Sequence, residues 1–139
     1  MKKPHSIQNI AVLLGAAMLF AACGKDNTNL IIGSWENTEQ SYEMTIAGTN
    51  TIPVGTIWME FTADSVMVAD LRCNCLPRWE HYTLTTKDGK RILHVENSFL
   101  GDCVVEGLTR NKMVLTSDDG PDMGFQYTLK RHTASTQPY

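Results

Sequence analysis

Three cysteines in the second half of this 139-residue sequence, Cys73, Cys75 and Cys103, carry its most specific chemistry. One residue separates Cys73 from Cys75, which is an awkward spacing for a disulfide between the two. We therefore expect Cys103 to pair with one of them, closing a loop of about 30 residues and leaving one thiol over. The sequence does not indicate which of the two it is. The alternative is that no disulfide forms and all three cysteines remain free thiols.

A metal site is another use that these cysteines allow. Together with a histidine, the three would make a Cys₃His set of the kind that binds zinc. Zinc sites usually have two to four residues between neighbouring cysteines, whereas a single asparagine stands between Cys73 and Cys75. We therefore expect neither a metal nor a cofactor.

His81 and His94 flank a predicted hairpin turn at Asp88-Gly89, where glycine tolerates a positive φ. Counting outward from this turn brings the two histidines within a residue or two of opposite positions on neighbouring strands. With Glu80 or Glu96 they could bind a metal or shuttle protons. Histidines on strands more often face solvent or make a single hydrogen bond, so we expect no site here.

Asp118 and Asp119 lie in the acidic run SDDGPD. The run is rich in oxygen ligands, but it lacks the D-x-[DN]-x-[DN]-G spacing of a calcium loop, and a turn explains it more simply. The sequence also lacks a G-x-S-x-G motif, a glycine-rich phosphate loop and a Cys–His pair with catalytic context. We therefore expect that the protein is not an enzyme.

Residues 1–22 are typical of a secretory signal peptide, with two lysines in the n-region, an apolar core (IAVLLGAAMLF) and two alanines before Cys23. The stretch LFAAC resembles the lipobox of bacterial lipoproteins, in which the chain is cut before the cysteine and the cysteine is acylated. This resemblance implies that acylated Cys23 anchors the protein in a lipid bilayer. Residues 23–30 (CGKDNTNL) then form a flexible polar tether.

The residues after Cys23 also bear on where the protein resides. Gly24 is not the aspartate that resembles an inner-membrane retention signal, and Lys25-Asp26 faintly resembles a surface-export signal. We expect a lipid anchor in the outer membrane, in either leaflet. Without Lys2 and Lys3 the chain has 10 basic and 15 acidic residues, a net charge of −5, and no basic patch. This charge argues against nucleic acid as a partner.

Short runs of alternating apolar and polar residues dominate residues 31–132, which we expect to form one domain followed by a tail at 133–139. No stretch after the cysteine has a sustained helical period. The pattern predicts eight or nine antiparallel strands, the first beginning at Gly33. The others lie at 42–47, 56–62, 66–71, 79–86, 91–97, 102–108, 112–117 and 124–131. Such a meander fits either a β-sandwich or a closed barrel, and closure removes exposed sheet edges.

Gly33-Ser34-Trp35 at the head of the first strand resembles the G-x-W signature of lipocalins. The resemblance, closest to small bacterial lipocalin-like lipoproteins, implies an eight-stranded up-and-down barrel whose closed end is plugged by Trp35. It also implies that a basic residue at the end of the last strand, Arg131 or Lys130, packs across the indole as a cation–π contact.

The barrel interior is where a lipocalin-like protein would bind its ligand. The alternation places a set of apolar side chains on the inward face, and we expect them to line the interior: Tyr42, Met44, Ile46, Ile57, Met59, Phe61, Phe125, Tyr127 and Leu129. An eight-stranded barrel holds one small ligand or is filled by side chains. We expect a membrane-anchored protein that binds a small hydrophobic ligand; the alternative is a structural or protein-interaction module with a filled barrel.

Overall fold

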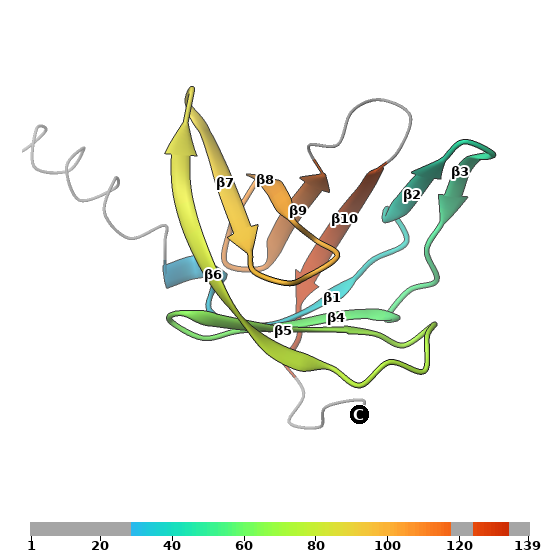
Figure 1. The fold of residues 1–139 in the computed structure, drawn as a ribbon, viewed down its shortest axis with the longest axis horizontal. Helices are drawn as coiled ribbons and strands as arrows, with labels where there is room; N and C mark the ends of the chain where they lie inside the picture. Colours follow the sequence, from blue (N-terminus) through green and yellow to red (C-terminus); the bar gives the residue numbers. More distant parts are fainter. Residues whose placement is uncertain (1–28, 118–123, 134–139) are drawn as a thin grey trace, which may run out of the picture.

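The computed structural model describes residues 29–117 and 124–133. A short 3-10 helix, η1 (Asn29–Ile31), precedes ten β-strands in these ranges (Figure 1). The strands are β1 (Gly33–Asn37), β2 (Tyr42–Thr45), β3 (Gly48–Thr51), β4 (Ile57–Phe61), β5 (Ser65–Asp70), β6 (Arg78–Lys87), β7 (Lys90–Val95), β8 (Asp102–Glu106), β9 (Lys112–Ser117) and β10 (Gly124–Arg131). None of the described helical residues forms a helix of the length and apolarity needed to span a membrane.

Eight of these strands close into an antiparallel barrel. Their order is β1-β4-β5-β6-β7-β8-β9-β10, and β10 pairs back with β1, so that Trp35 lies opposite Arg131. β2 and β3 extend the sheet beyond the ring from the other half of β10. The predicted all-β meander and its closure into a barrel are therefore confirmed, and the alternative of a two-sheet sandwich is not what forms.

β1 and β2 are successive parts of one bent edge along β10. β1 pairs with the C-terminal half of β10 and β2 with its N-terminal half, and the register shifts by two residues between them. The buried hydroxyl of Ser41 covers this gap, since it accepts from the Thr128 N–H at 2.9 Å and donates to the Thr128 carbonyl at 3.1 Å. Because the shift is an even number, the in–out alternation continues from Trp35 through to Glu43.

Asn37 fixes the link between β3 and β4. Its buried side chain donates to the Pro53 carbonyl at 2.9 Å and accepts from the Ile57 N–H at 2.8 Å. Both groups would otherwise lose water without gaining a partner, which costs free energy. The link is therefore held against β1 where the β2–β3 hairpin leaves the barrel.

The tight turn predicted at Asp88-Gly89 is present, and a second tight turn lies at Thr62–Ser65. Asp88 and Gly89 have φ values of 52° and 74°, as a type I′ turn between paired strands requires. Thr62 accepts from the Ser65 N–H through its hydroxyl at 3.1 Å and donates its own N–H to the Ser65 carbonyl at 2.9 Å. These turns join β6 to β7 and β4 to β5.

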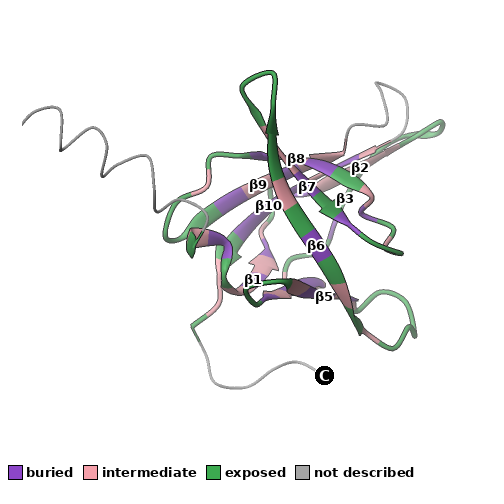
Figure 2. Cartoon of the chain, turned by 60° about the vertical axis from the view of Figure 1, so that its left-hand side comes forward, coloured by how far each residue is buried: buried purple, intermediate pink, exposed green. Residues whose placement is uncertain are grey.

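Packed side chains fill the inside of the barrel. The largest fully buried side chains are Trp35, Tyr127, Phe61, Ile31, Ile52, Ile57, Met59, Leu93, Leu100, Met113, Leu115 and Leu129. The long strand β6 crosses the front of the barrel in Figure 2 and is mostly exposed, with Tyr82 as its one buried residue. Trp58 belongs to the outer face, where its ring packs edge-on against His132 at 4.2 Å between centroids.

Candidate functional site

One end of the barrel is plugged by Trp35. This residue is fully buried, and its indole N–H donates to the Ile31 carbonyl at 2.8 Å. The guanidinium carbon of Arg131 lies 4.3 Å from the centre of the indole ring. The contact predicted between the first and last strands is therefore confirmed for Arg131, whereas Lys130 forms an exposed ion pair with Glu36 at 3.3 Å.

Arg131 also ties the N-terminal segment to this end. It donates to the carbonyls of Leu30 at 2.5 Å, Ile32 at 2.7 Å and Arg110 at 2.5 Å. Burial, together with the charge of Arg110, lowers the pKa of Arg131. Three carbonyl acceptors and an aromatic face hold this cation, which joins the N-terminal segment, the first strand and the last strand at the plugged end.

The opposite end carries a cavity of about 360 Å³, which we call the mouth cavity. Its walls come from β2, β5 and β6 and from the two loops that follow β5 and β7. The lining residues are Glu43, Val68, Asp70, Cys73, Cys75, Leu76, Arg78, Glu80, Asn97, Ser98 and Phe99. The volume lies in the lower part of the range of known ligand pockets.

The residues predicted to line a ligand site do not line the mouth cavity. Six of them belong to the packed core instead: Ile57, Met59, Phe61, Phe125, Tyr127 and Leu129. The expectation that they form a cavity wall is wrong because their own side chains fill the barrel beneath its mouth.

The predicted inward face of 42–46 is also reversed. Glu43 lies opposite Phe125 on β10 and contacts Tyr127, both of which face the core. Tyr42, one residue away, donates to Gln126 on the other face at 3.3 Å. Met44, two residues from Tyr42, shares that outer face, and Ile46 is 91% exposed. The apolar residues of this segment suggested that Tyr42 and Met44 face inward. The in–out alternation counted from Trp35 instead places Glu43 on the inward face.

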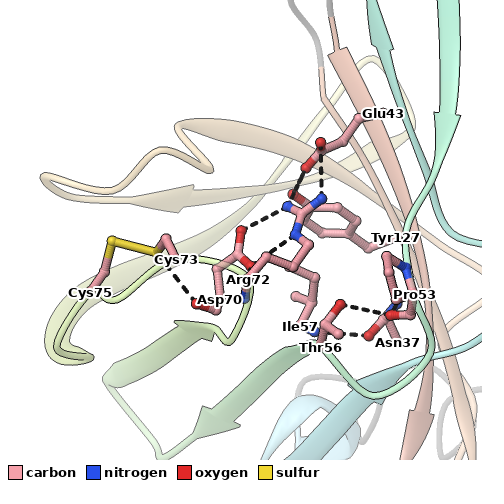
Figure 3. Close-up of polar contacts among 10 residues, drawn as sticks. All are labelled: Asn37, Glu43, Pro53, Thr56, Ile57, Asp70, Arg72, Cys73, Cys75 and Tyr127. Carbon is pink, nitrogen blue, oxygen red and sulfur yellow. Dashed lines mark hydrogen bonds and ion pairs between the residues drawn. A yellow bond between two sulfur atoms is a disulfide. The ribbon is translucent and has the colours of Figure 1, made fainter.

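Glu43 is part of a charged network in the wall of the mouth cavity (Figure 3). Arg72 donates to both carboxylate oxygens of Glu43, at 2.7 and 3.2 Å. The same guanidinium donates to both oxygens of Asp70, at 2.9 and 2.7 Å. The Tyr127 hydroxyl donates to Glu43 at 3.3 Å from the core side of the network. One arginine thus joins β2 to the end of β5.

These contacts shift the pKa values of the network. The hydrogen bond from Arg72 lowers the pKa of Asp70, and the bonds to Asp70 and Glu43 raise the pKa of Arg72. Burial, and then the negative charge of Glu43, raise the pKa of Tyr127. At neutral pH the Asp70 carboxylate therefore stays ionised and the Tyr127 phenol stays protonated, so these groups position charges rather than move protons.

The disulfide in the structure joins Cys73 to Cys75, whose Cα atoms are 5.3 Å apart. The predicted pairing of Cys103 with one of them is wrong. Cys103 is fully buried on β8, and its thiol donates to the Leu100 carbonyl at 3.2 Å. The loop that follows β5 turns back on itself, which brings two cysteines separated by one residue within bonding reach. Both line the mouth cavity.

The short spacing decides what this disulfide contributes to stability. In the chain-entropy account, a loop of three residues gives about 1.5 kcal/mol, compared with about 3.7 kcal/mol for the predicted 30-residue loop. The fold therefore depends little on this disulfide, which lies in an exposed loop.

His81 and His94 do not converge on a site. His94 lies opposite Thr83 and shares a hydrogen bond with Asp102 on β8, while His81 lies opposite Ser65 and is exposed. Within residues 29–117 and 124–133, no three His, Cys, Asp or Glu side chains are grouped as metal ligands would be. Cys23, the signal peptide and Asp118-Asp119 lie outside the described residues.

Comparisons with known proteins do not assign this chain to a family. No protein-family model matches the sequence, and no curated protein matches it significantly. A crystal structure of an uncharacterized protein from Bacteroides eggerthii resembles this fold with a TM-score of 0.45 and 16% identity. The likeness covers 73% of this chain and 98% of that one.

Proposed function

We propose that this protein is a lipid-anchored, lipocalin-like lipoprotein of the outer membrane that binds a small, largely hydrophobic ligand without catalysing a reaction. The observation that carries the ligand proposal is the mouth cavity of about 360 Å³ above a packed core. Val68, Leu76 and Phe99 give it an apolar surface, and Asn97 and Ser98 add polar groups that could orient a ligand.

Ligand binding is tested with protein purified from its own host without detergent. Native mass spectrometry should find a bound small molecule, and Phe99→Ser should lose it. Val54→Ser is the matched control, because Val54 is 55% exposed and does not line the cavity, while Phe99 is 59% exposed and does. Equal retention by both variants, or no bound molecule in the unmodified protein, would contradict the proposal.

The lipid anchor is tested separately by cell fractionation. Cys23→Ser should move the protein from the membrane fraction to the soluble fraction, because the acylated sulfur and amino group would be absent. Cys103→Ser serves as the control, since its thiol is buried in the barrel. A Cys23→Ser protein that stays with the membrane would contradict the proposal of a lipid anchor.

A second candidate is a protein-interaction module, favoured by the exposed apolar residues at the rim of the mouth cavity. Leu76 is 91% exposed and Phe99 is 59% exposed, although both are large and apolar. Exposed apolar residues that gather at one place mark binding surfaces. Crosslinking in intact cells, repeated after replacing residues 72–79, would test this function. An unchanged set of crosslinked partners would count against it.

A further inference from the structure

The Cys73–Cys75 disulfide lies where a small molecule in the mouth cavity can reach it. Both cysteines are exposed, and both line the cavity together with polar residues of the loop that follows β7. This disulfide closes a ring with only one residue between its cysteines. Such a short ring constrains the unfolded chain little, so the disulfide contributes little to the stability of the fold. Exposed disulfides are the ones that exchange with thiols.

We propose that this disulfide is a thiol–disulfide exchange site for low-molecular-weight aminothiols. The inference goes beyond ligand binding, because it concerns a covalent step at two named sulfur atoms.

The geometry distinguishes the two sulfur atoms. Cys73 Sγ lies 3.3 Å from the Asp70 carbonyl oxygen, which can accept a hydrogen bond from a thiol at that position. The incoming thiolate attacks Cys75 Sγ, a new S–S bond forms there, and the Cys73–Cys75 bond breaks. The electron pair leaves on Cys73 sulfur as a thiolate, which takes a proton from water. Only the protonated thiol donates to the Asp70 carbonyl, and this bond favours the mixed disulfide on Cys75 at equilibrium. Attack by a second aminothiol on the mixed disulfide releases an aminothiol disulfide and leaves both cysteines reduced.

The charges around the cavity select an aminothiol over an anionic thiol. Three carboxylates line the wall, those of Glu43, Asp70 and Glu80. Arg72 binds two of them, and Arg78 lies 4.0 Å from Glu80. The five groups together carry one net negative charge. In a water-like dielectric at low salt, one charge beside the reacting sulfur would favour a cationic over an anionic thiol by roughly a few fold, and added salt would reduce this preference.

A synthetic peptide provides a matched reference with the opposite charge. The oxidised peptide RCNCLPRW, residues 72–79, has both arginines and none of the three carboxylates. It should therefore react faster with an anionic thiol, whereas the folded protein should react faster with a cationic one. A reversal of order between protein and peptide cannot come from the local sequence.

The experiment uses the exported chain with Cys23→Ser, oxidised and treated with cysteamine, 2-mercaptoethanol or 2-mercaptoethanesulfonate. Rates are normalised to thiolate concentration, and the products are trapped by alkylation and mapped by mass spectrometry. We expect a mixed disulfide on Cys75, an alkylated Cys73, and cysteamine as the fastest reagent. Glu80→Gln should bring the cysteamine and sulfonate rates together. Cys103 should stay unlabelled, which reports that the fold is intact.

Three results would overturn the inference. In the first, the folded protein ranks the three thiols by rate in the same order as the free peptide does. In the second, the Cys73–Cys75 disulfide stays unreacted under conditions that convert the peptide, and in the third, Cys103 reacts first. Noncovalent binding is scored independently by native mass spectrometry. Loss of exchange with retention of a bound molecule overturns this inference alone, and loss of the bound molecule with retained exchange overturns only the ligand proposal.

Discussion

A β-carbon on Gly33 would lie 2.3 Å from Nη1 of Arg131, so the glycine of the G-x-W motif makes room for the cation that covers Trp35. Gly33 also has a φ of 126°, which side chains on L-residues rarely adopt. In the G-x-W motif, Trp35 therefore plugs the barrel, and Gly33 leaves the space through which Arg131 reaches the indole ring.

Gly33→Ala should destabilise the protein by about 2–4 kcal/mol, because it adds a steric clash to backbone strain. Gly48→Ala is the matched control. Gly48 has a φ of 124°, but a β-carbon there would meet nothing within 4 Å. We expect only the strain, about 1–2 kcal/mol, from this control. Chemical denaturation measures both, and equal losses would show that the Arg131 contact has no steric role.

Arg131→Met should lower the free energy of unfolding by about 2–4 kcal/mol. It removes the cation over Trp35 and three hydrogen bonds to carbonyls, while keeping an unbranched side chain. Lys130→Met, next to it, should cost at most about 1 kcal/mol, since its ion pair with Glu36 is exposed. A larger loss from Lys130→Met than from Arg131→Met would contradict this assignment of the closing residue.

Asp70→Asn should make the stability of the protein less sensitive to acid. Arg72 holds the pKa of Asp70 below its ordinary value in the folded state. The stabilisation from this carboxylate is therefore present above its unfolded pKa of about 4 and is lost as the pH falls through the lower folded value. Melting temperatures between pH 2 and pH 7 should show the largest gap between the two proteins near neutrality. A gap that does not narrow in acid would contradict the prediction.

Reduction of the protein should cost only about 1.5 kcal/mol of folding free energy, because the disulfide closes such a short loop. The double variant Cys73→Ser/Cys75→Ser should be insensitive to reductant and serves as the control. Denaturation curves with and without a phosphine reductant measure the difference. A loss near 3.7 kcal/mol would instead indicate the long loop to Cys103.

The sequence was sufficient for the parts of the fold that depend on local chemistry or on a distinctive pair. Asp88-Gly89 predicted a turn because two positive φ values are needed there, and Trp35 with Arg131 predicted how the barrel closes. Glu43 was placed on the wrong face, because the apolar residues beside it suggested an inward stripe. Its inward position depends on Arg72 in the loop after β5 and on Tyr127 on β10, which neutralise or bind the carboxylate.

The mouth cavity and the Cys73–Cys75 disulfide could not be predicted from sequence patterns, because both depend on the course of loops. The mouth cavity is made by loops after β5 and β7, whose course has no periodic signal. General spacing rules disfavoured a Cys73–Cys75 bond, whereas the turn of this loop brings the Cα atoms to 5.3 Å. Cys103, the expected partner, is needed as a core residue on β8.

The chain enters the fold at the plugged end of the barrel, where Arg131 binds the carbonyl of Leu30 in η1, on the side of Figure 1 opposite the β2–β3 hairpin. Cys23 precedes Asn29 by six residues, a reach of at most about 20 Å. A lipid on Cys23 would therefore attach the barrel to the bilayer from its plugged end, and the tether would limit how far that end can move away. Cys75 and Phe99 line the cavity at the other end of the barrel, where molecules would arrive from the aqueous compartment.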